Sequence, residues 1–211
     1  MPEDDYGTWS PGRVEELSDG VIAIAITLLV LEIGIPTIEE TSSDHELWSR
    51  LRDLWPSYVG FLISFITIAL FWMIHHRLFH RLNRVNHQLI VANMALLIVV
   101  VFLPFPTAVL AEHLNHDGER AATIFYSGCL LVGVMIFSFL WHVAKDENGH
   151  LLKESVSRVE IAILDRRIRR SVVLYGVAFA LSFLIPLLCL ALLAALCVYY
   201  LLAPHALPKT Q

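Results

Sequence analysis

Charged residues are scarce in this sequence: Asp, Glu, Lys and Arg make up 17% of the 211 residues, whereas hydrophobic residues make up 56%. A soluble domain carries closer to a quarter charged residues. The polar residues form short clusters between long apolar runs, and the mean hydropathy is +0.63. This segregation is typical of a chain whose solvent is lipid. The sequence also lacks a basic tail or an arginine patch interleaved with aromatic residues, so it indicates no nucleic-acid partner.

Cysteine is rare as well, and the three cysteines, Cys129, Cys189 and Cys197, all lie inside apolar runs. Thiols in such surroundings usually serve packing, so we expect no disulfide. The segment from Met1 to Gly12 is acidic and polar, and it lacks the basic start and the directly following apolar stretch of a signal peptide. The first apolar segment is therefore expected to remain in the protein.

No catalytic signature such as GxSxG or HExxH occurs on or between the apolar runs. This argues against a membrane enzyme, and we expect no cofactor and no resident metal. Two weaker patterns stay open. His76 and His80 have a spacing that can hold a metal, although no cysteine or carboxylate accompanies them. His142 could pair with His75 or His76 as a haem ligand in an electron carrier.

Six apolar segments can cross a hydrocarbon core of about 30 Å, which requires roughly 20 helical residues. The last apolar run has 32 residues and would measure about 48 Å as one helix, and Pro186 lies near its middle. We predict a tight hairpin of two helices there, with a single kinked helix as the alternative. The predicted spans are Leu17–Ile35, Trp55–His75, Leu89–Leu110, Ala121–Val143 and the two halves of Val172–Ala203.

Basic residues are distributed unevenly between the predicted loops. With the N-terminus in the cytoplasm, twelve Lys and Arg residues fall on the cytoplasmic side, and only Arg50, Arg52 and Arg120 fall outside. The positive-inside rule therefore predicts a multi-pass protein of the cell (inner) membrane with both termini in the cytoplasm. The chain then divides into a cytoplasmic N-terminal segment (1–16), a six-helix transmembrane domain (17–203) and a cytoplasmic tail (204–211).

The loop from Lys145 to Arg170 is the only sizeable polar insert, and no internal repeat is evident. Within it, Glu154–Ile168 has apolar residues near helical spacing and predicts an amphipathic helix. Its end is strongly basic, and these residues are expected to meet anionic headgroups where the fifth helix enters the membrane. They are Arg166, Arg167, Arg169 and Arg170.

The most informative segment runs from Arg13 to Glu32 and reads RVEELSDGVIAIAITLLVLE. Ser18 and Asp19 are good residues for a helix start, because their oxygens can accept hydrogen bonds from unpaired backbone N–H groups. Gly20 permits close backbone approach. The remainder of the segment is almost wholly apolar.

One stripe of this segment repeats at helical spacing. Ile24, Leu28 and Leu31 lie at positions i, i+4 and i+7, and Thr27 borders the stripe. Periodicity alone leaves open whether such a stripe faces lipid, another helix or a pore.

The same segment resembles the signature of the transmembrane protein 175 family, which comprises endosomal and lysosomal potassium channels with bacterial homologues. The resemblance rests on RxxxLSDGV followed by AIAITLLVLE, with Leu17 where the family has Phe. Two later stretches are also similar to the family: FW and HHR at 71–72 and 75–77, and LPFPT at 103–107.

The resemblance implies a homotetramer of six-helix subunits in which four first helices line a pore for potassium and other monovalent cations. By matched position, Ile24 forms the narrowest hydrophobic ring, Leu28 and Leu31 add further rings, and Thr27 adds a ring of hydroxyls. The chain contains no Thr-Val-Gly-Tyr-Gly segment, the carbonyl filter of ordinary potassium channels. Narrow apolar rings are expected to serve as both hydrophobic gate and filter.

Polar residues near the cytoplasmic ends of the first two predicted helices complete the expected site. Ionisable side chains at membrane depth usually have partners, so we expect a cross-helix network that steadies the pore helix, with interfacial snorkelling as the alternative. A proton-coupled cation transporter or a proton channel that uses Asp19 and the second-helix histidines is the competing function. The motif and network residues are Arg13, Ser18, Asp19, Gly20, Trp72, His75 and His76.

Overall fold

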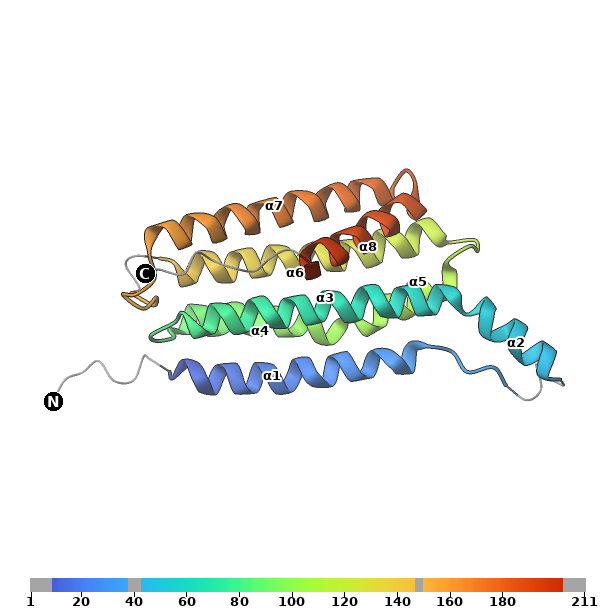
Figure 1. The fold of residues 1–211 in the computed structure, drawn as a ribbon, viewed down its shortest axis with the longest axis horizontal. Coiled ribbons are helices and arrows are strands. Elements are labelled where there is room, and N and C mark those ends of the chain that lie inside the picture. The colour runs from blue at the N-terminus through green and yellow to red at the C-terminus, as the bar shows by residue number, and fades with distance from the viewer. Residues whose placement is uncertain (1–8, 38–42, 147–149, 203–211) are drawn as a thin grey trace.

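Helices make up all named regular structure in the residues that the computed structural model describes, which are 9–37, 43–146 and 150–202. The predicted all-α fold is therefore confirmed. The long helices lie side by side, and a short helix projects from one end of the bundle (Figure 1). The elements are α1 (Pro11–Leu28), a 3-10 turn (Leu29–Glu32), α2 (Asp44–Asp53), α3 (Trp55–His80), α4 (His87–Phe102), α5 (Pro104–His113), α6 (Glu119–Ala144), α7 (Arg158–Ser182) and α8 (Pro186–Leu202).

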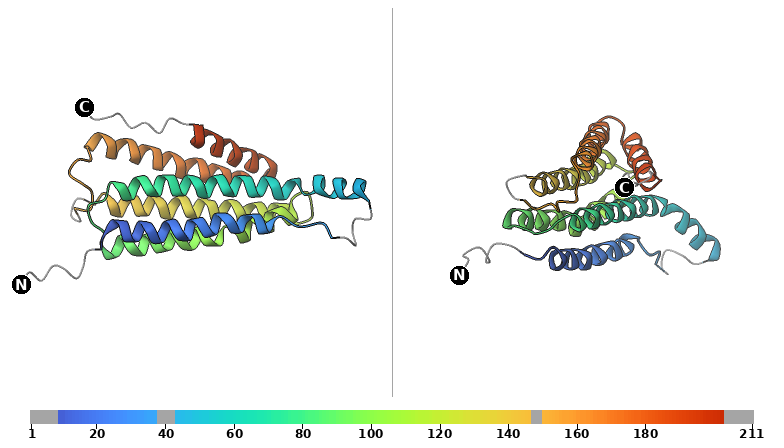
Figure 2. Two further views of the ribbon diagram at one scale, coloured as in Figure 1. Left: turned by 60° about the horizontal axis from the view of Figure 1, so that its bottom comes forward. Right: turned by 60° about the vertical axis from the view of Figure 1, so that its left-hand side comes forward.

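The helices form a layered bundle with α1 on one side. α1 packs against α3 and α4, whereas α7 packs against α6 and α8 on the opposite side (Figures 1 and 2). One end of the bundle gathers the start of α1, the end of α3, the start of α4, the end of α6 and the start of α7. We call this end, which carries Arg13, Arg77, Arg81 and Arg158, the basic end.

Three rods are long and apolar enough to cross a membrane, namely α3, the continuous α4–α5 unit His87–His113, and α6. They coincide with the second, third and fourth predicted spans to within a few residues. The α4–α5 unit is interrupted at Leu103, since Pro104 follows and begins α5. The chain is therefore a membrane protein.

The last apolar run forms two helices instead of one kinked helix. α7 ends at Ser182, α8 begins at Pro186, and α8 runs back along α7 (Figure 2). A hydrogen bond of 2.7 Å between the hydroxyls of Ser171 and Tyr200 joins the pair. Pro186 lies in the first turn of α8, where its missing N–H costs no helical hydrogen bond.

Two predicted helix starts are wrong. α1 begins at Pro11, with Ser10 at the N-cap position, so Ser18 and Asp19 lie inside the helix and cap nothing. Proline in the first helical turn explains this earlier start. The predicted amphipathic helix Glu154–Ile168 is not a separate element either, because α7 runs unbroken from Arg158 to Ser182.

α7 and α2 each begin with a serine whose side chain caps the helix N-terminus. Ser157 and Glu160 form a reciprocal capping box at the start of α7. α2 lies in the first external loop of the prediction, where no helix was expected, and the Ser43 hydroxyl accepts from the Glu46 N–H at its start. The predicted tail, 204–211, lies outside the described residues.

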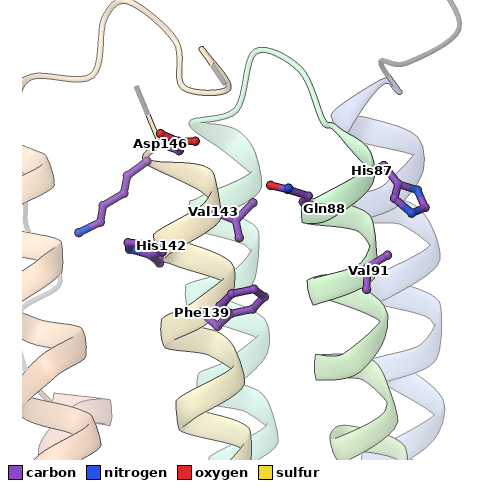
Figure 3. A pocket seen from close by; sticks show the side chains of 8 residues that line it. His87, Gln88, Val91, Phe139, His142, Val143 and Asp146 are labelled. Carbon is purple, nitrogen blue, oxygen red and sulfur yellow. The ribbon is translucent and has the colours of Figure 1, made fainter. Parts of the chain in front are cut away.

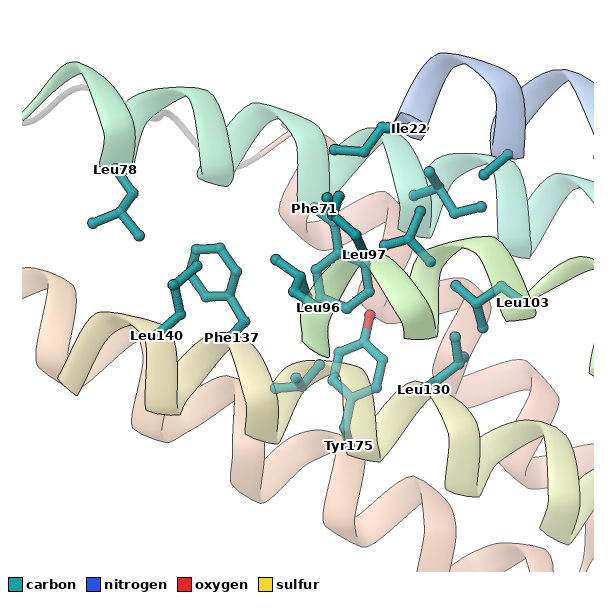
Figure 4. Packing of buried hydrophobic residues seen from close by; sticks show 14 of the residues in the cluster. Ile22, Phe71, Leu78, Leu96, Leu97, Leu103, Leu130, Phe137, Leu140 and Tyr175 are labelled. Atoms are coloured by element: carbon teal, nitrogen blue, oxygen red, sulfur yellow. The ribbon is translucent and has the colours of Figure 1, made fainter. Parts of the chain in front are cut away.

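Large apolar side chains from α3, α4, α6 and α7 fill the bundle centre (Figure 4). The rings of Phe71 and Phe137 stack with centroids 6.5 Å apart. Gly133 allows α6 to approach closely here, because a Cβ at this position would lie 3.0 Å from Cζ of Phe71. Close packing of this kind is what holds helices together in lipid.

A second set of central contacts is polar. The Ser64 hydroxyl of α3 lies 2.7 Å from the Thr107 hydroxyl of α5 and 2.8 Å from the Tyr126 hydroxyl of α6, and all three side chains are buried. Thr107 also donates to the carbonyl of Leu103 in its own chain segment. Ser64 therefore joins three helices through one oxygen.

We expect Ser64→Ala to destabilise the protein more than Tyr126→Phe does. Ser64→Ala leaves the buried Tyr126 hydroxyl without its partner, whereas Tyr126→Phe leaves the Ser64–Thr107 bond intact. Interhelical hydrogen bonds in membranes contribute about 0.6 kcal/mol on average, and an unpaired buried hydroxyl adds to the loss. The measurement is the free energy of unfolding of both variants in mixed micelles. Ser182→Ala, a buried serine bonded only within its own helix, is the control, and a larger loss for Tyr126→Phe would contradict the assignment.

Candidate pore helix and its polar network

α1 has two distinct faces. Its buried residues follow a helical stripe of three- and four-residue steps, and this stripe packs against α3 and α4. The buried residues of α1 are Val14, Ser18, Ile22 and Ala25, and Leu29 continues the stripe in the 3-10 turn.

The opposite face of α1 is exposed in the subunit. Ile24 is 61% exposed, Leu28 is 40% exposed and Leu31 is 73% exposed, although all three are large apolar side chains. Gly20 and Thr27 are exposed on the same face. Leu31 lies in the 3-10 turn and not in α1, so its direction departs from the predicted i+7 register.

Thr27 makes a local hydrogen bond. Its hydroxyl donates to the carbonyl of Ile24 at 2.8 Å. Because the only hydroxyl proton is used in this way, the oxygen keeps its lone pairs for an acceptor role on the exposed face.

A chain of buried hydrogen bonds joins α1, α4 and α3. The Ser18 hydroxyl donates to the carbonyl of Val14 at 2.8 Å and accepts from Nδ2 of Asn93 at 2.9 Å. Oδ1 of Asn93 lies 2.9 Å from Nε2 of His75. The exposed fractions of Ser18, Asn93 and His75 are all 0%.

The donor directions along this chain are mutually consistent. Asn93 gives its amide protons to Ser18, so its carbonyl oxygen must accept the proton on Nε2 of His75. Nδ1 of His75 is buried and has no partner among the described residues, which fits a bare nitrogen on a neutral ring. The His75 ring stacks on Phe79 with centroids 4.2 Å apart.

Two further contacts join the more exposed sides of α1 and α3. Nε1 of Trp72 donates to Oδ1 of Asp19 at 2.9 Å, and Nδ1 of His76 lies 2.7 Å from Oε1 of Glu15. The rings of Trp72 and His76 also stack, with centroids 6.1 Å apart. Asp19 is therefore held by the neighbouring helix.

Most of the predicted network residues meet, but two of the partners were not predicted. Asn93 and Glu15 complete the contacts with His75 and His76. Asn93 is the only residue with an amide side chain in the apolar run of the third predicted span, and a polar residue in such a run is the signal that could have marked it. Arg13 is exposed and takes no part in these contacts among the described residues.

The remaining histidines that the structure describes form no ligand cluster of three or more residues. The residues that the structure describes contain no group of three or more His, Cys, Asp or Glu side chains placed to hold a metal. His142 lies with His87 in an open hollow of about 870 Å³ between α4 and α6 (Figure 3). His75 does not line this hollow, and its Nε2 is engaged by Asn93.

Comparison with known proteins shows the family of this chain. The family model described as endosomal/lysosomal potassium channel TMEM175 matches residues 13–104. A potassium channel of Chamaesiphon minutus is 43% identical over 198 residues, which cover 92% of this chain and 95% of that protein. The chain belongs to the TMEM175 family. This is a family of ion channels and not of enzymes.

Structural comparison gives the same family. The crystal structure of a lysosomal potassium-selective channel TMEM175 homolog from Chamaesiphon minutus matches with a TM-score of 0.81 and 42% identity, over 93% of this chain and 98% of that chain. An animal TMEM175 from Danio rerio, named an endosomal/lysosomal proton channel, is 32% identical over 133 residues. That match covers 61% of this chain and 25% of the animal protein.

We expect Asn93→Ala to loosen α1 from the bundle. The substitution leaves His75 and Ser18 without their interhelical partner, and an unsatisfied buried polar group costs about 1–3 kcal/mol. Hydrogen–deuterium exchange measured by mass spectrometry should show that the substitution accelerates exchange in α1, relative to the wild type, more than it does in α6. Ser18→Ala, which removes only one of the two Asn93 bonds, should have a smaller effect. Equal exchange of α1 in Asn93→Ala and the wild type would refute the role of Asn93.

Proposed function

We propose that this protein is a potassium-permeable cation channel whose pore is lined by α1. The observation that carries the proposal is the exposed apolar stripe of Ile24 and Leu28 on α1, followed by exposed Leu31 in the 3-10 turn, while the other face of α1 packs on the bundle. Membership in a family of ion channels and the similarity to a potassium channel of Chamaesiphon minutus support the same function.

The proposed assembly is a homotetramer in the cell (inner) membrane. One copy of α1 cannot enclose a pore, so the exposed face requires further copies around an axis. We propose six membrane spans per subunit. These are the three long apolar rods and, in addition, α1, α7 and α8. Both termini are proposed to be cytoplasmic, because the arginines of the basic end would then follow the positive-inside rule.

Conduction is proposed to be passive and controlled by dewetting. A narrow ring of four Ile24 side chains would exclude water and resist ions, and so act as gate and size filter. Leu28 and Leu31 would form wider rings farther along. Potassium sheds its hydration shell more easily than sodium does, and apolar rings therefore favour potassium modestly.

Thr27 is proposed to supply the missing oxygen ligands. Its proton is directed to the Ile24 carbonyl, which leaves the hydroxyl oxygen free to face a partly dehydrated cation. Four such oxygens beside the constriction would replace some of the lost water. No cofactor is required for this mechanism.

A proton channel or proton-coupled transporter is the second candidate. The name of the animal relative and the bare Nδ1 of buried His75 favour it. Asp19→Asn separates the two functions, because it removes a titratable group from the polar contacts between α1 and α3. Loss of proton flux in vesicles with unchanged potassium flux would show a distinct proton path.

We expect Ile24→Asn to raise the single-channel conductance severalfold, because an amide ring keeps water in the constriction. Planar-bilayer recording of purified protein in symmetrical potassium provides the measurement. Ile98→Asn is the matched control: Ile98 is an exposed isoleucine of α4, and its substitution should leave the unitary current unchanged. An unchanged current in Ile24→Asn would remove Ile24 from the constriction.

We expect Thr27→Val to lower the potassium-to-sodium permeability ratio by about two- to tenfold, the effect of one lost hydrogen-bond-sized contact. Thr27→Ser retains the oxygen and should preserve the ratio. Reversal potentials under bi-ionic conditions measure both. The oxygen plays no part in selectivity if the valine variant discriminates as well as the wild type.

A further inference from the structure

A cavity of about 440 Å³ opens near the basic end, between α3, α6, α7 and the last turn of α8. It is lined by five arginines, and no Asp or Glu is among its lining residues. Two helices, α3 and α7, contribute these arginines. They are Arg77 and Arg81 of α3 and Arg166, Arg167 and Arg170 of α7.

Asp165 of α7, next to Arg166 in the sequence, does not neutralise this cluster. Asp165 accepts from Nζ of Lys145 at 2.7 Å and from Nε1 of Trp141 at 2.6 Å. Burial raises the pKa of Asp165, but these hydrogen bonds and the charges of Lys145 and Arg169 outweigh it and lower the pKa overall. Asp165 is therefore ionised and already paired.

One arginine also has an unsatisfied donor. Nη1 of Arg81 donates to the carbonyl of Arg77 at 2.6 Å, whereas the buried Nε of Arg81 has no partner among the described residues. Buried donors in folded proteins are nearly always satisfied. Guanidinium groups that line one cavity without a carboxylate among the lining residues favour binding of an anion.

The cavity lies where α8 ends, and α8 is shorter than α7. The 17 residues of α8 measure about 25 Å, and the 25 residues of α7 measure about 37 Å. α8 therefore leaves the first turns of α7 uncovered (Figure 2). Its last turn closes the inner side of the gap, where Arg170 lies 5.2 Å from the Tyr199 ring centroid.

The inner end of the cavity is apolar. A smaller cavity of about 60 Å³ adjoins it, and both are lined by Ile74, Phe137 and Tyr200. This inner part reaches Leu70 and Val134, deeper in the bundle. A basic mouth at one end of the bundle and an apolar interior together fit an amphiphile, since a soluble anion would use only the arginines.

We propose that this cavity binds an anionic phospholipid, with the phosphate among the five guanidinium groups and an acyl chain along Phe137 and Tyr200. In the proposed orientation the lipid belongs to the cytoplasmic leaflet. Binding does not require α1 to line a pore, so the site and the channel function can fail separately.

The test compares two double variants of α7 that remove the same charge. Arg166→Gln with Arg170→Gln changes two exposed arginines of the cavity, and Arg158→Gln with Arg169→Gln changes two exposed arginines outside it. Native mass spectrometry of detergent-purified protein should count bound phosphatidylglycerol. We expect the first variant to bind it about tenfold or more weakly than the wild type, and the second to bind it nearly as well.

Three outcomes would overturn the proposal. Equal losses in the two double variants would show attraction by surface charge and not by the cavity. If phosphatidylcholine binds as tightly as phosphatidylglycerol, the cavity does not select lipids by the net charge of the headgroup. Inorganic phosphate at millimolar concentration is the third probe. If it raises the thermal stability of the protein as much as phosphatidylglycerol does, the ligand is a soluble anion and not a lipid.

Discussion

The hydrogen-bond chain from Ser18 through Asn93 to His75 is the contact on which the placement of α1 depends. In lipid, apolar burial does not hold helices together, because acyl chains are as apolar as leucine. Close packing of the buried stripe of α1 on α3 and α4 attracts the helices, and interhelical hydrogen bonds add a directional constraint to it. A directional chain across three helices fixes one rotation, and that rotation leaves Ile24 and Thr27 on the free face.

Several elements could be predicted from the sequence because their cause is local. Apolar runs of sufficient length gave α3, the α4–α5 unit and α6, and Pro186 gave the break between α7 and α8. The start of α2 also has a local cause, the hydroxyl of Ser43 that accepts from the Glu46 N–H, but this short polar signal is weak between two long apolar segments.

The partners in the network could not be predicted in the same way. Asn93 lies 75 residues from Ser18 in the chain, and only the packing of α1 on α4 brings them together. Ser18 was assigned to a helix start because serine commonly caps one. Inside a membrane helix the same hydroxyl instead bonds back to Val14 and accepts from a neighbouring helix, which satisfies it without a terminus.

The positions of the two proposed sites are compatible within one assembly. α1 lies on one side of the bundle, and α7 and α8 lie on the other, with α3, α4 and α6 between them (Figures 1 and 2). Copies that meet through α1 around an axis must turn α7 and α8 outward. The arginine cavity would then open toward lipid, where an anionic headgroup can enter it without approaching the pore.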